Sequence, residues 1–330
     1  MADSRLILSS GLPLLLLLSL LALTIGAAPL TYAEVAAGLL GIGSEEHRLI
    51  VQQIRLPRVL LAWLVGAALG TSGAALQGLL RNPLAEPGLL GISASASLGA
   101  VLVLSCGLTS VNLWLLPTGA MTAALVTTTA LYLLTRQRAN NLTLILAGVA
   151  LSALASALTS LVLNLAPNPT DVQDIVLWLL GSISDRSLTD VWLCLPFVIL
   201  GLGLLLSCAP ALEVLALGEA EASSLGVEVA RVRGQIIIGV ALCVGATVAI
   251  AGSIGFVGLV VPHILRRLVA QRPGRLLWPS AIGGAVLVVV ADVMVRLLDT
   301  PKELMLGVVT ALLGAPFFLG LVLRTRSELG

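Results

Sequence analysis

The feature that most constrains this chain is a run of 22 residues, Val59 to Leu80, that contains no charged side chain. A helix of ~20 residues crosses the ~30 Å hydrocarbon core of a bilayer. Only structures that satisfy their own backbone hydrogen bonds are stable at that depth. Arg55 and Arg58 precede the run, and Arg81 ends it. Pro57 suits the first turn of a helix, so we predict a transmembrane helix from about 58 to 80.

The bulk composition points to the same environment. The chain is 58% apolar and only 11% charged, whereas soluble domains carry about 25% charged residues. The formal net charge of +1 excludes a nucleic-acid binder held by a basic field. The four cysteines lie in apolar runs without a C-x-x-C pair, so we predict no metal site and no disulfide.

Apolar runs of similar length recur along the chain. The first is too long for a signal peptide core of ~7–15 residues, so we expect it to be retained. Glycine and alanine spaced four apart predict close helix packing in a compact bundle. We therefore predict an all-α polytopic membrane protein, one transmembrane domain over residues 1–330. Splitting the two longest runs at 107–112 and 251–255 gives ten predicted crossings: 6–28, 58–80, 91–107, 114–135, 142–165, 190–208, 231–251, 255–270, 276–298 and 304–323.

The distribution of basic residues predicts the topology. Ten crossings place both termini on one side of the membrane, and 12 of the 18 Lys and Arg residues then share that side. The side richer in Lys and Arg is cytoplasmic. Both termini are therefore predicted to be cytoplasmic, and Arg55 is predicted to lie on the outer side.

Two polar connections are long enough to form helices of their own. On the outer side, Thr170 and Gln173 have the spacing of a capping box, and Gly181 can end a helix. We predict a short helix at 171–180 that lies on the outer surface. On the inner side, we predict a short helix within about 217–227, with acidic residues at its start and Gly226 as its stop. A passive amphipathic connector and a docking helix for a cytoplasmic motor are both compatible with this inner segment.

No catalytic constellation is visible. The chain has no G-x-x-x-x-G-K-[ST] phosphate loop, and His47 and His263 are isolated. Asp292 and Arg296 are the only charges deep in an apolar run, and their spacing of four places them on one helix face as a pair. Ion-coupled carriers usually need an acid or histidine within the bilayer. The apolar runs offer no such relay, so we expect transport to draw its energy from elsewhere.

Several long motifs together resemble the permease subunits of the iron-chelate and vitamin B12 type ABC importers. The resemblance covers nearly the whole chain. The segments that carry it are Arg55–Arg58, Arg81–Gly91, Leu217–Gly226, Gly255–His263, Asp292–Arg296 and Gly307–Phe317.

The resemblance implies a homodimer in the bacterial inner membrane, with two cytoplasmic ATPase subunits and a periplasmic binding protein. ATP and Mg would be used by the ATPase, and no cofactor would be bound by this chain. Arg55, Arg58 and Arg296 would meet acidic residues of the binding protein. The positions that would dock on the ATPase are Gly218, Glu219, Ala220, Glu221, Ser224, Leu225 and Gly226. The fifth crossing would line the translocation path with Ser152, Ser156, Thr159, Ser160 and Asn164.

Other classes of protein stay open at this point. An ion-coupled secondary transporter or a channel would need no ATPase. A membrane-embedded enzyme would need a polar constellation within the bundle, and none is visible. Ferric siderophore, haem and cobalamin are all possible substrates, and we favour an iron chelate because such importers form the larger part of the family.

Overall fold

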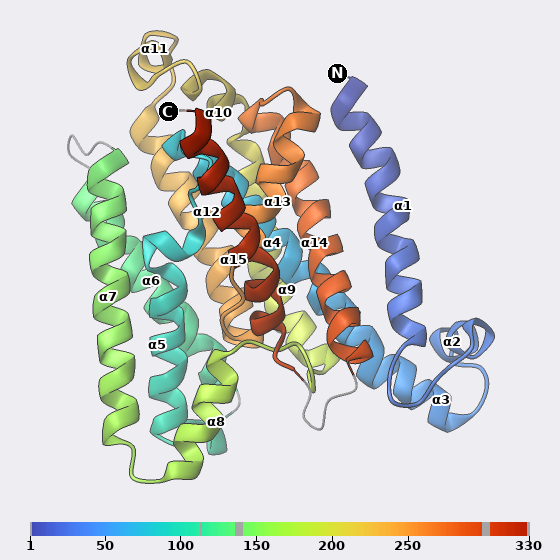
Figure 1. Cartoon of the computed structure of the whole chain (residues 1–330). Helices are drawn as coiled ribbons and strands as arrows, with labels where there is room; N and C mark the ends of the chain where they lie inside the picture. Colours follow the sequence, from blue (N-terminus) through green and yellow to red (C-terminus); the bar gives the residue numbers. More distant parts are fainter. Residues whose placement is uncertain (1, 113, 136–140, 299–303, 329–330) are drawn as a thin grey trace.

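The computed structural model describes residues 2–112, 114–135, 141–298 and 304–328, and these form helices and turns with no β-strand among them. The helices lie mostly along one common direction (Figure 1). In chain order they are α1 (Ala2–Thr24), α2 (Tyr32–Leu39), α3 (Glu45–Leu49), the π-helical turn η1 (Ile50–Arg55), α4 (Leu56–Leu80), the 3-10 turn η2 (Pro87–Leu90), α5 (Ile92–Ser105), the 3-10 turn η3 (Leu108–Ser110), α6 (Leu115–Thr135), α7 (Asn141–Leu165), α8 (Pro169–Leu179), α9 (Leu188–Ser207), α10 (Ala209–Leu215), α11 (Glu219–Ser224), α12 (Val229–Ala251), α13 (Val257–Leu265), the 3-10 turn η4 (Arg266–Val269), α14 (Pro273–Leu297) and α15 (Leu306–Glu328).

Each of the ten predicted crossings coincides with a helix: α1, α4, α5, α6, α7, α9, α12, α13, α14 and α15. Within the described residues, six helical segments are long and apolar enough to span a membrane by length and composition. Shorter apolar helices occupy Ser10–Thr24, Ile92–Ser105 and Leu306–Gly320. The two chain ends lie at the same end of the bundle as α11, and α2, α3 and α8 lie at the opposite end (Figure 1). This arrangement agrees with the predicted topology, with α11 inside and α8 outside.

The core of the bundle forms around α4. This helix is apolar on all sides, as expected of a helix surrounded by other helices, and every residue from Ala68 to Leu80 is buried. Its glycines allow backbone contact with α14 and α13. A Cβ added at Gly70 would lie 2.1 Å from the Ser280 carbonyl oxygen, and one at Gly73 would lie 1.9 Å from that of Gly258. The predicted close packing of helices through small residues is thus confirmed.

The predicted helix start near residue 58 is confirmed, since α4 begins at Leu56 with Pro57 in its first turn. The prediction did not include the helical residues that precede α4, because helical structure continues back to Glu45 through η1 and α3. The turn before the proline widens into η1, where the Leu56 N–H bonds to the Val51 carbonyl. A proline has no N–H, and its ring clashes with the carbonyl four residues earlier. A π-helical turn relieves both problems without ending the helix.

Two other local predictions need correction. The predicted crossing at 255–270 is a helix of only nine residues, α13, followed by η4. Its length of ~14 Å is too short to cross a bilayer. The capping box of Thr170 and Gln173 is not formed, because Pro169 occupies the first turn of α8 and Asn168 is the N-cap. The predicted end of α8 is confirmed, since Gly181 follows it with a φ of 78°.

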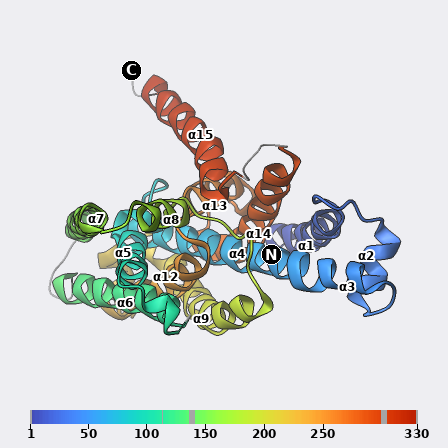
Figure 2. The ribbon, with the colours of Figure 1, turned by 90° about the horizontal axis from the view of Figure 1, so that it is seen from below.

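One flank of the bundle is loosely covered. Viewed from below, α7, α8 and α15 lie along one side, with α15 extending away from the other helices, while α1, α2 and α3 occupy the far end (Figure 2). Large apolar side chains of α7 and α15 are exposed on these helices, among them Leu154, Leu161, Leu312 and Leu319. These helices therefore present apolar surface that the rest of the chain leaves uncovered.

Candidate functional site

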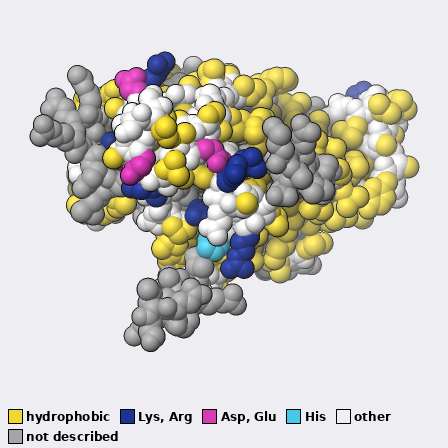
Figure 3. Space-filling model, turned by 90° about the horizontal axis from the view of Figure 1, so that it is seen from above, with side chains coloured by type: hydrophobic (Ala, Val, Ile, Leu, Met, Phe, Trp, Pro, Cys, Tyr) yellow, Lys and Arg dark blue, Asp and Glu magenta, His cyan; other side chains and the backbone are white. Residues whose placement is uncertain are grey.

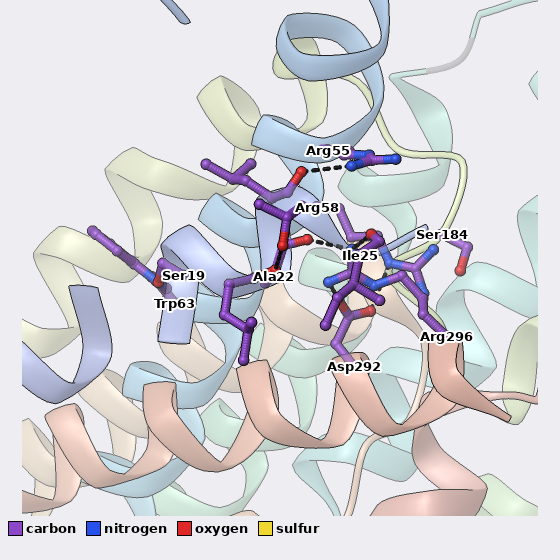
Figure 4. A network of polar contacts seen from close by, with 12 residues as sticks. Ser19, Ala22, Ile25, Arg55, Arg58, Trp63, Ser184, Asp292 and Arg296 are labelled. Carbon is purple, nitrogen blue, oxygen red and sulfur yellow. Dashed lines mark hydrogen bonds and ion pairs between the residues drawn. The ribbon is translucent and has the colours of Figure 1, made fainter. Parts of the chain in front are cut away.

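The three arginines predicted for docking lie in one cluster at the outer end of the bundle (Figure 4). Asp292 is at its centre, with a side chain only 2% exposed. The Arg58 Nε lies 2.6 Å from Asp292 Oδ1, and an Arg296 Nη lies 2.6 Å from Asp292 Oδ2. The predicted pair of Asp292 and Arg296 is confirmed, and Arg58 joins it from α4.

The remaining guanidinium contacts go to the end of α1. Arg55 donates to the Leu23 carbonyl at 2.6 Å and to the Ala28 carbonyl. Arg296 donates to the carbonyls of Ala22 and Ile25, at 2.7 and 2.8 Å. The last carbonyls of a helix have no partner within it and carry partial negative charge. Two arginines therefore stabilise the C-terminal end of α1 and fasten it to α4 and α14.

The charge of this outer arginine cluster, defined as Arg55, Arg58, Arg296 and Asp292, is not balanced internally. Three guanidinium groups against one carboxylate leave 3 − 1 = +2 for these four side chains. Arg55 is 4% exposed as a residue, and the side chains of Arg58 and Arg296 are 12% and 8% exposed. The positive charge therefore lies just beneath the outer surface rather than on extended side chains.

At the inner end, α11 forms where the predicted coupling helix was placed. Gly218 precedes it with a φ of 139°, and Gly226 follows it with a φ of 85°, conformations that glycine adopts without steric cost. Glu219 is held by an ion pair with Arg233 of α12, with 2.9 Å between the charged atoms. Among the predicted coupling residues, Ala220, Glu221, Ser224, Leu225 and Gly226 are exposed.

The surface around α11 combines charge with exposed apolar side chains. Leu217 and Leu225, at either end of the helix, are each 66% exposed. Seen from above, acidic and basic side chains gather over this end of the molecule, while its flank is apolar (Figure 3). Single exposed leucines also occur on surfaces without a partner, so both the docking helix and the passive connector stay compatible with this surface.

The polar residues predicted to line the path lie on α7, which is exposed along most of its length. Ser156, Ser160 and Asn164 are exposed, and Ser152 and Thr159 are half-buried. The Thr159 and Ser160 hydroxyls donate to the helix carbonyls of Ala155 and Ser156 at 2.9 and 3.0 Å. Hydroxyls engaged in this way offer a solute only weak hydrogen bonds.

Sequence reasoning missed two polar connections. Arg58 lies at the outer start of α4 and Asp292 near the outer end of α14, so their equal depth was a signal that they could pair. Glu86 was assigned to a polar turn, but its carboxylate accepts the Phe256 N–H at 3.0 Å inside the bundle. The only local sign was its position between two proline-containing turns. No group of three His, Cys, Asp or Glu side chains that could hold a metal occurs in the described part of the chain.

Comparison with known proteins covers almost the whole chain. The profile of the FecCD transport family matches residues 14–324. The chain is 39% identical to the Fe(3+) dicitrate transport system permease protein FecD of Escherichia coli, over 93% of this chain and 95% of that protein. It is 41% identical to the hemin transport system permease protein HmuU of Yersinia pestis, over 83% of both chains.

A vitamin B12 permease and a solved structure complete the comparison. The chain is 39% identical to the vitamin B12 import system permease protein BtuC of Citrobacter koseri, over 86% of this chain and 85% of that protein. A solved metal-chelate type ABC transporter in an inward-facing conformation superposes with a TM-score of 0.86 at 33% identity. That match covers 97% of this chain and 99% of the other.

Proposed function

The chain belongs to the FecCD transport family. From this premise we propose that its inner end binds the ATPase and its outer end binds the binding protein. It is a multi-pass permease subunit of an ABC importer for a metal chelate, haem or cobalamin. The observation that carries this conclusion is the family match over residues 14–324. The finer proposal is a homodimer in a bacterial inner membrane, powered by two separate ATPase subunits and supplied by a periplasmic binding protein.

The inner end is proposed to receive the motion of the ATPase through α11. The support is its exposed surface, with Leu217 and Leu225 exposed and Glu219 tied to α12 by Arg233. Movement of α11 would pass to α12 through that ion pair. A large interface would cover the leucines, and the acidic residues would set the orientation of the partner.

The coupling proposal is tested by reversing charge on α11. We expect Glu221→Arg to reduce uptake about tenfold in vesicles that contain the full complex, because Glu221 is exposed on the proposed docking face. The exchange of Glu219→Arg with Arg233→Glu separates docking from internal stability, because it retains the ion pair and reverses only the exposed charge. Normal uptake in both variants would refute the docking role of α11.

The outer arginine cluster is proposed to attract acidic residues of the binding protein. Its net charge of +2 supports this, since complementary charge gives register and speeds association. Arg55 is a poor site for the test, because a carboxylate there would face the α1 carbonyls. Arg58→Gln is better, since Asp292 still keeps Arg296 as a partner.

We expect Arg58→Gln to weaken binding-protein association several-fold at low salt and little at high salt, because salt screens the attraction that the cluster exerts through water on an approaching acidic partner. Arg48→Gln is the matched control, since Arg48 is exposed on α3 outside the cluster. Surface plasmon resonance with the permease in nanodiscs measures both. An equal loss of affinity in Arg58→Gln and Arg48→Gln would refute docking at this cluster. So would unchanged affinity of Arg58→Gln at low ionic strength.

The translocation path is proposed to form where α7 of two copies face each other. The exposed polar side chains Ser156, Ser160 and Asn164 of α7 support a second copy on this face, because polar groups are unfavourable against lipid. The internally bonded hydroxyls of Thr159 and Ser160 suit a large solute that must not be held. Native mass spectrometry of the purified permease tests the dimer. A monomer at all concentrations would refute it.

The substrate is proposed to be an iron chelate, with haem and cobalamin as the alternatives named for the relatives. Vesicles that contain the permease, the ATPase and the binding protein are tested with ferric citrate, a ferric siderophore, haem and cobalamin. ATP-dependent uptake of one of these is expected. Gradient-driven uptake by the permease alone would instead establish the ion-coupled carrier.

A further inference from the structure

Glu86 is a half-buried acidic residue in an apolar bundle. Its partner, Phe256, has a Cβ 2.3 Å from the position that a Cβ on Gly314 would take. Gly314 is eight residues into α15, which is about 12 Å along that helix. The nearby Gly258 packs on Gly73, seven residues before the inner end of α4 and so about 10 Å from it. Glu86 therefore lies well away from both ends of the bundle.

The segment that carries Glu86 bridges two parts of the molecule. We call residues 82–91, between α4 and α5, the re-entrant segment, because the chain turns back into the bundle there. On one side, Pro87 Cδ lies 3.1 Å from the Cβ position of Gly258 in α13. On the other, a Cβ on Gly91 would lie 2.8 Å from the Ser152 nitrogen in α7. The re-entrant segment thus contacts both α13 and the helix proposed to line the path.

Glu86 supplies a directional bond across the first of these contacts. Its Oε1 accepts the Phe256 N–H at 3.0 Å. Phe256 is the N-cap of α13 and has a φ of 66°, a left-handed conformation that is uncommon for a bulky residue. An N–H at the start of a helix has no partner within the helix, and a carboxylate is favoured there by the helix dipole. The bond therefore stabilises the break between α12 and α13.

α13 itself has the form of a short rigid block. It is nine residues long, and left-handed residues stand beyond each end, Phe256 before it and Ala270 and Gln271 after η4. Phe256 also packs on Gly314 of α15. Glu86, Phe256 and Gly314 therefore form a contiguous connection from the re-entrant segment to α15.

We propose that Glu86 is a positioning residue for transport, whose carboxylate holds the re-entrant segment, and through it α7, in register with α13 and α15. This inference rests on the proposed function. A single hydrogen bond suits the task, because it orients two elements but can break and re-form as the permease changes state. The Glu86 carboxylate acts here through one acceptor oxygen, so an amide of the same length should replace it.

The test compares Glu86→Gln with Glu86→Met in the complete complex of permease, ATPase and binding protein in vesicles. The two side chains have similar volume, and only glutamine keeps an acceptor oxygen. We expect Glu86→Met to lower the number of substrate molecules imported per ATP about tenfold, and Glu86→Gln to retain more than half. Glu46→Met is the control, since Glu46 is an exposed carboxylate on α3, away from the re-entrant segment and α13. Its import per ATP should stay at the wild-type value.

Amide exchange of the permease alone tests the bond without relying on transport. The Phe256 amide should exchange about tenfold faster in Glu86→Met than in the wild type, and at nearly the wild-type rate in Glu86→Gln. Unchanged exchange of the Phe256 amide in Glu86→Met, equal loss of coupling in both Glu86 variants, or equal loss of coupling in Glu46→Met would each overturn the proposal. If the wild type imports none of the candidate substrates, the proposed function fails, and the exchange measurement still decides whether the bond exists.

Discussion

Asp292→Asn should lower the stability of the fold. At the same time, it should strengthen the attraction between the outer surface and an acidic partner. The substitution removes the only carboxylate of the outer arginine cluster while nearly preserving its volume. Asp292 contacts Arg58 and Arg296 at 2.6 Å each, and its side chain is 2% exposed. Breaking a buried ion pair by removing one partner costs about 3–5 kcal/mol. The amide keeps one acceptor oxygen, so we expect the low end, about 3 kcal/mol.

The assay is thermal unfolding of the detergent-solubilised permease, with binding-protein affinity measured in parallel. A loss of about 3 kcal/mol should lower the Tm by about 4 °C in a chain of this size, because the entropy of unfolding grows with chain length. The charge of the cluster rises from +2 to +3, so association with an acidic partner should become faster at low salt. Glu46→Gln is the control, since it removes an exposed carboxylate on α3 outside the cluster.

A double-mutant cycle separates the two ion pairs. Asp292→Asn combined with Arg58→Gln should cost less than the sum of the single changes, because the second substitution removes a buried cation whose carboxylate partner has already been removed. A loss of stability below about 0.5 kcal/mol for Asp292→Asn would refute the reasoning, since that is the range of ordinary surface substitutions. If the losses of stability in the two single variants simply add in the double variant, the contact between Asp292 and Arg58 is refuted.

Two further predictions concern packing and pH. Gly73→Ala should prevent assembly of α13 on α4 or lower the Tm by more than 10 °C, because its Cβ would lie 1.9 Å from the Gly258 carbonyl oxygen; Gly203→Ala, where nothing lies within 4 Å, is the control and should leave the Tm unchanged. Hydrogen bonds from Thr31 lower the pKa of Glu34, so the capping box at the start of α2 is stable at neutral pH and is lost as the pH falls through that lowered pKa. The protection of the Thr31 amide, measured as its exchange rate relative to the intrinsic rate at each pH, should therefore fall in acid, and Glu34→Gln should remove that pH dependence of the protection.

The membrane fold could be predicted closely from the sequence, because its signals are local. A charge-free run such as Val59–Leu80 has few alternatives to a helix in lipid. The unequal distribution of arginines between the two sides of the membrane then predicts the orientation of the helices. The inner helix α11 was also predictable, since Gly218 and Gly226 mark its ends. The sequence also placed Pro57 correctly in the first turn of α4, but it did not predict that helical structure continues before the proline to Glu45 through the wider turn η1.

Contacts between distant parts of the chain came only from the tertiary structure. Arg58 and Asp292 are 234 residues apart, and Glu86 and Phe256 are 170 apart. The periodicity of a sequence shows which face of a helix is apolar, but it does not show which other helix packs on that face. It therefore cannot predict contacts between residues so far apart in the chain. Packing α4 against α14 and α13 brings these groups together, and the cost of leaving a charge unpaired in an apolar interior then makes each pair specific.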